Sequence, residues 1–168
     1  MQKVLKKLPI NFSGTNTLQI SARKSSYLKK AVIEEFLPRF GKGCEVLCVK
    51  DTSSKVLYIE EQKLNDLKFF KLSNEELPDI IAYNNKKNWV YLIEAVYSSG
   101  PMSETRVLEL KKLLKDCKAY LIFITTFISR TELKKWALDI AWETEVWTAD
   151  HPDHVIHYNG DKFFGPYK

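Results

Sequence analysis

The sequence lacks any apolar run long enough to cross a bilayer, which takes about 20 residues in a helix. Its longest apolar stretch, residues 119–127, is short and contains two threonines. The first ten residues, MQKVLKKLPI, are positively charged but lack the apolar centre of a secretion signal. We therefore expect a cytoplasmic protein with no membrane partner.

Glycine and cysteine are also scarce. Only six of the 168 residues are glycine, and they form no glycine-rich loop of the kind that holds nucleotide phosphates, so we expect no nucleotide cofactor. The three cysteines, Cys44, Cys48 and Cys117, lie in apolar segments. An odd number of cysteines in such segments predicts buried free thiols rather than a disulfide framework.

Arginine is the rarer basic residue, with four arginines against 22 lysines and a formal net charge of +5. Lysine meets phosphate as a point charge, whereas arginine is the usual reader of guanine edges. The balance permits a polyanionic partner without requiring one. It leaves few arginines for reading a base sequence.

The hydrophobic fraction, 45%, is enough for one folded domain with a sizeable core. The spacing of apolar residues predicts the order helix, strands, helix, strand, helix, strands. This order indicates an α/β fold in which a mixed central sheet is flanked by helices. Residues 1–20 show the weakest pattern, so we expect them to be a flexible leader that precedes a domain over residues 21–168.

The clearest pattern is a hairpin in the middle of the chain. Residues 80–83 and 89–96 are almost entirely apolar, and the polar residues 84–88 between them read as a turn. The symmetry of this hairpin places Asp79 opposite Glu94. Residues directly opposed on antiparallel strands have Cβ atoms about 4.5–5.5 Å apart.

Two carboxylates at that separation repel each other, and an apolar setting makes ionisation harder still. A hard divalent cation such as Mg²⁺ resolves the conflict, because it binds one or two carboxylates and a phosphate oxygen. Asp79 and Glu94 are therefore the candidate metal ligands. The alternative is structural, with Asp79 capping a turn after Pro78 and Glu94 pairing with a neighbouring lysine.

The first strong helix signal covers residues 24–40. At about 100° per residue, Glu34 points away from the apolar arc of this helix. Glu35 lies at the edge of the arc, beside Leu28. Of the two glutamates, Glu35 is therefore the one nearer the apolar side of the helix, where its simplest role is to solvate the helix edge.

The hairpin, the first helix and several further blocks of the sequence resemble the BsuBI/PstI family of type II restriction endonucleases, within the wider PD-(D/E)XK nuclease fold. The resemblance spans about residues 20–167 in ordered blocks. The blocks are KAVIEEF at 30–36 with PRF at 38–40, LPDII at 77–81, WVYLIEAV at 89–96, SSGP at 98–101, DIAWETEVW at 139–147 and PDHVIHYNGD at 152–161.

The resemblance implies a Mg²⁺-dependent endonuclease whose catalytic domain covers residues 21–168. It implies cleavage of double-stranded DNA, at a palindromic site, by a homodimer. It assigns Asp79 as the first catalytic acid and Glu94 as the second, both on the metal. The first helix of this fold often supplies a further acid, for which Glu35 is the candidate.

One departure from the wider fold concerns the residue two positions after the second acid. Most such nucleases have a lysine there, whereas this chain has Val96. Ser98, Ser99, Arg106 and Lys111 lie nearby in sequence, and the sequence does not choose a substitute among them. The amides and hydroxyls of the SSGP turn can bind phosphate, so we expect Ser98, Ser99 and Arg106 to contact DNA.

The second departure is length. Full enzymes of the family resemble this chain only in their C-terminal part and have a further N-terminal domain. Three alternatives therefore stay open: a catalytically inactive DNA-binding remnant, a nuclease of the same fold that acts on other DNA substrates, and a protein-interaction domain.

Overall fold

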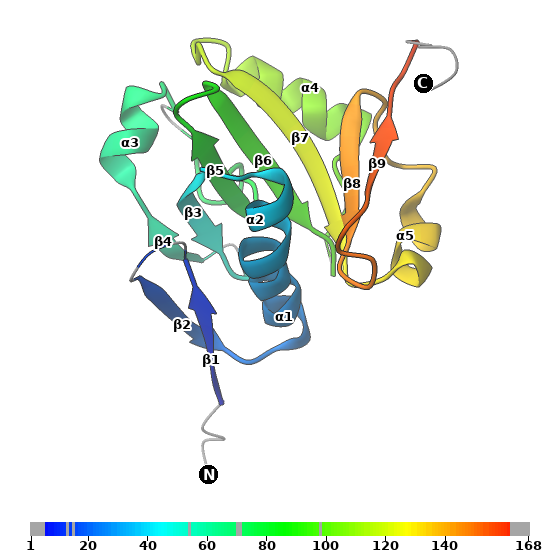
Figure 1. The fold of residues 1–168 in the computed structure, drawn as a ribbon. Helices are drawn as coiled ribbons and strands as arrows, with labels where there is room; N and C mark the ends of the chain where they lie inside the picture. The colour runs from blue at the N-terminus through cyan, green and yellow to red at the C-terminus, as the bar shows by residue number, and fades with distance from the viewer. Residues whose placement is uncertain are drawn as a thin grey trace.

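The computed structural model describes residues 6–12, 14, 16–53, 55–69, 72–97 and 99–161. Within this part of the chain, a seven-stranded sheet with the strand order β4-β3-β5-β6-β7-β8-β9 forms the centre (Figure 1). Its strands are β3 (Glu45–Lys50), β4 (Val56–Ile59), β5 (Ile80–Asn84), β6 (Trp89–Ala95), β7 (Tyr120–Phe127), β8 (Thr144–Thr148) and β9 (Val155–Tyr158).

The sheet is mixed, as the sequence predicts. The pairs β6·β7 and β7·β8 are parallel, and the remaining neighbours in the sheet are antiparallel. The helices of the described residues are α1 (Lys24–Ala31), η1 (Val32–Phe36), α2 (Leu37–Phe40), α3 (Glu61–Asp66), α4 (Glu104–Leu113) and α5 (Arg130–Trp136). The continuous run α1-η1-α2 lies on one face of the sheet and α4 on the other (Figure 1).

The central strands carry buried side chains on both faces of the sheet, because helices cover both faces. Ile93 and Ala95 of β6 belong to the apolar cluster that includes Val32 and Phe36 of η1. Leu92 of β6 belongs instead to the cluster on the α4 side. This alternation follows from the two-residue period of a strand, and it assigns Glu94, the next even position, to the α4 side.

The first helix covers the predicted residues 24–40, but its middle turn is wider than an α-helical turn. Residues 32–36 form a π-helix, in which the hydrogen bonds skip one more residue. This turn carries both Glu34 and Glu35. The angular positions expected for an uninterrupted α-helix therefore do not hold for residues beyond it.

The described part of the expected leader is folded. It contains the antiparallel strands β1 (Lys7–Asn11) and β2 (Thr17–Ser21). Ile10 is fully buried and Ile20 is 3% exposed, and both belong to the cluster under α1 and η1. The structure thus differs from the expected flexible leader, because alternate residues of the hairpin reach the core.

The central hairpin has the predicted register. Ile80 pairs with Ile93 and Asn84 with Trp89 in the antiparallel pair β5·β6. Each pair sums to the same value as Asp79 and Glu94, so the register continues to these two residues at the end of the hairpin. The three cysteines are free thiols, as predicted. In the described residues, no helix combines the length and the apolar character needed to span a membrane.

Candidate functional site

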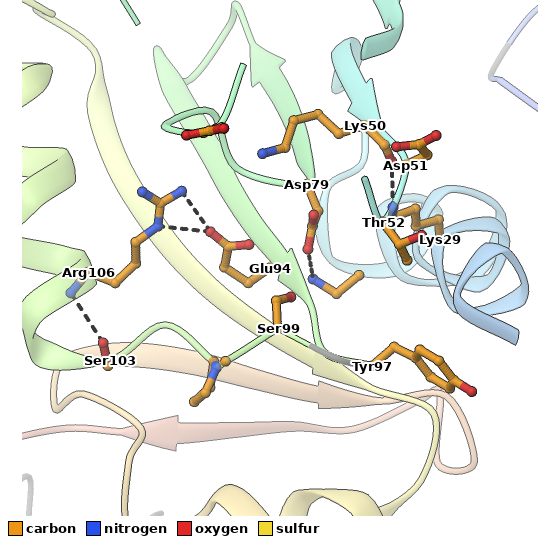
Figure 2. A pocket seen from close by; sticks show the side chains of 14 residues that line it. Lys29, Lys50, Asp51, Thr52, Asp79, Glu94, Tyr97, Ser99, Ser103 and Arg106 are labelled. Carbon is orange, nitrogen blue, oxygen red and sulfur yellow. Dashed lines mark hydrogen bonds and ion pairs between the residues drawn. The ribbon is translucent and has the colours of Figure 1, made fainter. Parts of the chain in front are cut away.

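A cavity of about 350 Å³ opens where β5 begins and β6 ends. Both predicted acids line it, together with residues from α1, β3 and the loop before α4 (Figure 2). The charged residues of its wall are Lys29, Lys50, Asp51, Glu75, Asp79, Glu94 and Arg106. The sequence-based pairing of Asp79 with Glu94 is therefore part of a larger charged site.

Asp79 and Glu94 come together because the hairpin register opposes them. The backbone N–H of Ala95 donates a hydrogen bond to Oδ2 of Asp79 over 2.9 Å, which fixes the Asp79 carboxylate against the end of β6. Glu94 is 7% exposed.

This setting raises the pKa of the Glu94 carboxyl group well above its ordinary value. Burial is the largest cause, and the charge of Asp79 is the next. Arg106 acts in the opposite direction, because its guanidinium favours the ionised form. Burial and the neighbouring carboxylate therefore disfavour ionisation of Glu94.

Arg106 is held by the loop and helix that follow β6. Met102 donates its backbone N–H to Oγ1 of Thr125 over 3.0 Å, which anchors the loop to β7. Ser103 then caps α4 by accepting a hydrogen bond from the backbone N–H of Arg106. The guanidinium reaches Oε1 of Glu94 through Nε at 3.1 Å and Nη2 at 3.0 Å.

Of the predicted DNA-contacting residues that the structure describes, Arg106 contacts a predicted catalytic acid, Glu94. Its Nη1 also pairs with Glu109 at 3.1 Å, and its Nη2 donates to the carbonyl of Glu76 at 2.8 Å. These protein contacts engage all three guanidinium nitrogens. The geometry favours neutralisation of Glu94 as its main role.

Lys29 and Lys50 are site residues that the sequence reasoning missed. Lys29 is 3% exposed, and its Nζ donates to the backbone carbonyl of Lys50 over 2.5 Å. Lys50 is 4% exposed, and its Nζ donates to the carbonyl of Asn74 over 2.9 Å. The backbone N–H of Lys50 also donates to the backbone carbonyl of Asp79. Both ammonium groups therefore belong to the wall that carries the acids.

Glu35 does not line the cavity. Lys29 is the residue that the α1-η1-α2 run contributes to the lining, and Glu35 follows it by six residues, or about 9 Å at the α-helical rise. The neighbouring Glu34 is engaged elsewhere, with Asn11 and Lys30. Glu35 is thus outside the cavity lining, and its role as a third acid stays a prediction.

The remaining predicted contacts divide into three cases. Ser99 lines the cavity and is exposed. Ser98 lies outside the described residues. Lys111, one of the four candidates to replace a lysine at position 96, has its Nζ 5.8 Å from the centre of the Phe123 ring and does not line the cavity.

The acids fit a hard divalent cation. Carboxylate oxygens are the donors that Mg²⁺ prefers, and it commonly takes only one or two of them with water and substrate phosphate. Among the described residues, no group of three or more His, Cys, Asp or Glu is arranged to hold a metal. Asp79 and Glu94, the pair that the sequence predicts as ligands, both line the cavity.

Comparison with solved structures defines the class of fold. The chain superimposes on the SdaI restriction endonuclease with a TM-score of 0.86 and 33% sequence identity. The match covers 96% of this chain and 51% of the SdaI chain. A mixed sheet with an acidic pair in a charged cavity is thus a restriction-endonuclease-like domain.

Sequence comparison then gives the family. Residues 8–161 match the BsuBI/PstI restriction endonuclease domain, and the chain belongs to this family. It is 38% identical over 162 residues to the type II restriction enzyme BsuBI of Bacillus subtilis. It is 31% identical over 170 residues to the type II restriction enzyme AplI of Arthrospira platensis. The chain spans about half the length of these curated relatives.

Proposed function

We propose that this chain is the nuclease domain of a type II restriction endonuclease and that it hydrolyses phosphodiesters of double-stranded DNA. The observation that carries the proposal is the opposed pair Asp79 and Glu94 in a cavity with Lys29, Lys50 and Arg106. Membership of the BsuBI/PstI family supports the same activity. A DNA substrate also agrees with the expected cytoplasmic location.

The reaction is a hydrolysis at phosphorus. The oxygen of one water molecule bonds to phosphorus while the bond from phosphorus to O3′ breaks. One water proton ends on O3′ and the other leaves to solvent, so the products are a 3′-hydroxyl and a 5′-phosphate. Negative charge grows on the phosphate oxygens, and cationic groups in the cavity wall stabilise it.

Asp79 and Glu94 are the proposed ligands of Mg²⁺. When bound, the cation supplies positive charge beside the phosphate and lowers the pKa of a water molecule. Asp79 is held for this role by the N–H of Ala95. Arg106 holds the Glu94 side chain in place through Oε1.

Two further features of the proposal come from the family. Cleavage of both strands of a palindromic site calls for two copies of the domain related by a twofold axis, so we propose a homodimer. Ser98 and Ser99 are the proposed DNA contacts of the loop between β6 and α4. Exposure of Ser99 at the cavity wall supports that role.

The test is cleavage of phage DNA by the purified chain with Mg²⁺, with Asp79→Asn and Glu94→Gln as variants. Both substitutions keep the size of the side chain and remove its negative charge. We expect the wild type to cleave and each variant to lose about 100-fold or more in rate, because the metal ligand is lost. The control is Glu109→Gln, which removes an exposed carboxylate on α4.

The outcomes separate the alternatives. Duplex binding without cleavage, in Mg²⁺ or Mn²⁺, would identify an inactive DNA-binding domain. Cleavage that Asp79→Asn leaves unchanged would remove the acidic pair from the mechanism. Cleavage of branched or damaged DNA but not of ordinary duplexes would assign the fold to another DNA substrate.

A further inference from the structure

The cavity has a strong asymmetry between its cations. Arg106 lies on the α4 side and pairs with both Glu94 and Glu109. On the other side, Lys29 and Lys50 donate only to backbone carbonyls. Figure 2 shows Lys29 entering from α1, with Asp79 and Glu94 lying between it and Arg106.

Lys29 is a buried positive charge without a carboxylate partner. Among the described residues, none of the salt bridges within 4.0 Å involves its Nζ. An ammonium group has three N–H donors, and the bond to the Lys50 carbonyl uses one of them. Donor capacity and positive charge thus remain at the cavity wall, where a bound anion would use both.

Burying this ammonium group opposes its positive charge. Burial lowers the pKa of the Lys29 ammonium, and the nearby charge of Asp79 is the largest effect in the opposite direction. A lysine at this position of α1 therefore works against the stability of the helix packing. Such a cost is typical of a residue that serves a function.

Position 96 cannot provide a comparable charge. Val96 is 5% exposed and packs in an apolar cluster with Phe127 and Leu133. A cation for the substrate phosphate must therefore come from another element. Of the candidates considered from the sequence, Lys111 lies away from the cavity and Arg106 is already paired.

We infer that Lys29 is a catalytic residue, whose ammonium group contacts an oxygen of the scissile phosphate. It supplies from helix α1 the charge that Val96 cannot supply from the end of β6. This inference rests on the proposed nuclease function for its role in the reaction. The binding of a phosphate group beside Lys29 can be tested without any cleavage.

The test compares four forms of the chain for binding of thymidine 5′-monophosphate in the presence of Mg²⁺, by titration calorimetry. This probe carries a terminal 5′-phosphate like that of the proposed product. The forms are the wild type, Lys29→Gln, Lys29→Arg and the control Lys30→Met. Lys30 is the next residue of α1, but its Nζ contacts Pro9 and Glu34 outside the cavity.

We expect Lys29→Gln to weaken binding about tenfold or more, because a charge-assisted hydrogen bond is lost. Lys29→Arg keeps the charge and should lose about threefold or less, and Lys30→Met should bind as the wild type does. The glutamine side chain can still donate to the Lys50 carbonyl, so we expect Lys29→Gln to fold, and thermal unfolding checks that it does. If Lys29→Gln does not fold, Lys29→Met takes its place in the test, because the methionine side chain fills the same apolar space.

Wild-type affinity in Lys29→Gln would overturn the inference, and so would failure of the wild type to bind the nucleotide. Single-turnover cleavage adds an independent readout, with an expected loss of about 100-fold in Lys29→Gln. If the wild type cleaves and Asp79→Asn does not, but Lys29→Gln cleaves normally, the inference fails and the nuclease function stands. If the nucleotide binds through Lys29 and no form cleaves DNA, the nuclease function fails and the phosphate site stands.

Discussion

Arg106 holds Glu94 by two contacts to a single carboxylate oxygen, from Nε at 3.1 Å and from Nη2 at 3.0 Å. This relationship joins α4 to the end of β6. Among the described residues, Arg106 provides the only salt bridge to a carboxylate of the acidic pair. The stability of the cavity and the ionisation of Glu94 therefore depend on the same side chain.

Replacing Arg106 with methionine should destabilise the domain by about 3 kcal/mol at alkaline pH, where Glu94 is ionised and loses its partner. Urea unfolding at about pH 9 measures the change in free energy, and the loss should shrink as the pH falls below the raised pKa of Glu94. The control is Lys111→Met on the same helix, whose ammonium lies over the Phe123 ring. Equal stability of the two variants would show that the contact between Arg106 and Glu94 contributes nothing.

Glu94→Gln should make stability less sensitive to alkaline pH in the absence of metal. Burial and Asp79 raise the pKa of Glu94 from 4.5 to about 8 in the folded chain. Between these values the unfolded chain loses a proton that the folded chain keeps, so wild-type stability falls as pH rises through this window. Glutamine cannot ionise, so the stability of Glu94→Gln relative to the wild type should rise by about 4 kcal/mol across this window.

The measurement is thermal unfolding of both forms in EDTA, from about pH 5 to about pH 8. The difference between them should be small at the acidic end and should grow with pH. The control is Glu109→Gln, which removes an exposed partner of Arg106 and should follow the wild type. A constant difference across the range would contradict the raised pKa of Glu94.

Mg²⁺ binding should tighten with pH for the same reason. A carboxyl group must lose its proton before it can bind the cation, so binding releases that proton. Below the raised pKa of Glu94, affinity should rise by about tenfold per pH unit. Titration calorimetry in two buffers of different ionisation enthalpy measures both the affinity and the proton release. Affinity that is independent of pH would place the cation away from Glu94.

The acidic pair could be predicted from the sequence because its geometry is local. A strand has a two-residue period and the turn at 84–88 is short, so the register of the hairpin fixes Asp79 opposite Glu94. The central strands and the helix over 104–113 have equally clear periods. Their positions follow from neighbouring residues rather than from distant contacts.

Glu35 and Lys29 show what the helix pattern alone could not settle. The angular argument selected Glu35, but it ignored where along the helix the end of the sheet would lie. Lys29 falls about 20° from both Phe36 and Phe40 on a helix of about 100° per residue, which puts a charge inside the apolar arc. That signal is present in the sequence and indicates a buried lysine.

The hairpin β1–β2 provides the last test, because it decides whether residues 7–21 belong to the domain. Short strands with mostly exposed side chains gave a weak pattern, since one buried residue in each strand carries the core contact. Ile10→Ala should destabilise the domain by about 2–4 kcal/mol, as expected when a fully buried isoleucine leaves a cavity.

The matched control is Gln19→Ala, an exposed position of the same hairpin that should change stability by less than about 0.5 kcal/mol. Urea unfolding of both variants measures the difference. A flexible leader would contribute no core contact, so Ile10→Ala would then unfold at the wild-type midpoint. If Ile10→Ala loses stability and Gln19→Ala does not, the hairpin belongs to the unit that unfolds cooperatively. That unit holds α1, and with it Lys29, against the sheet.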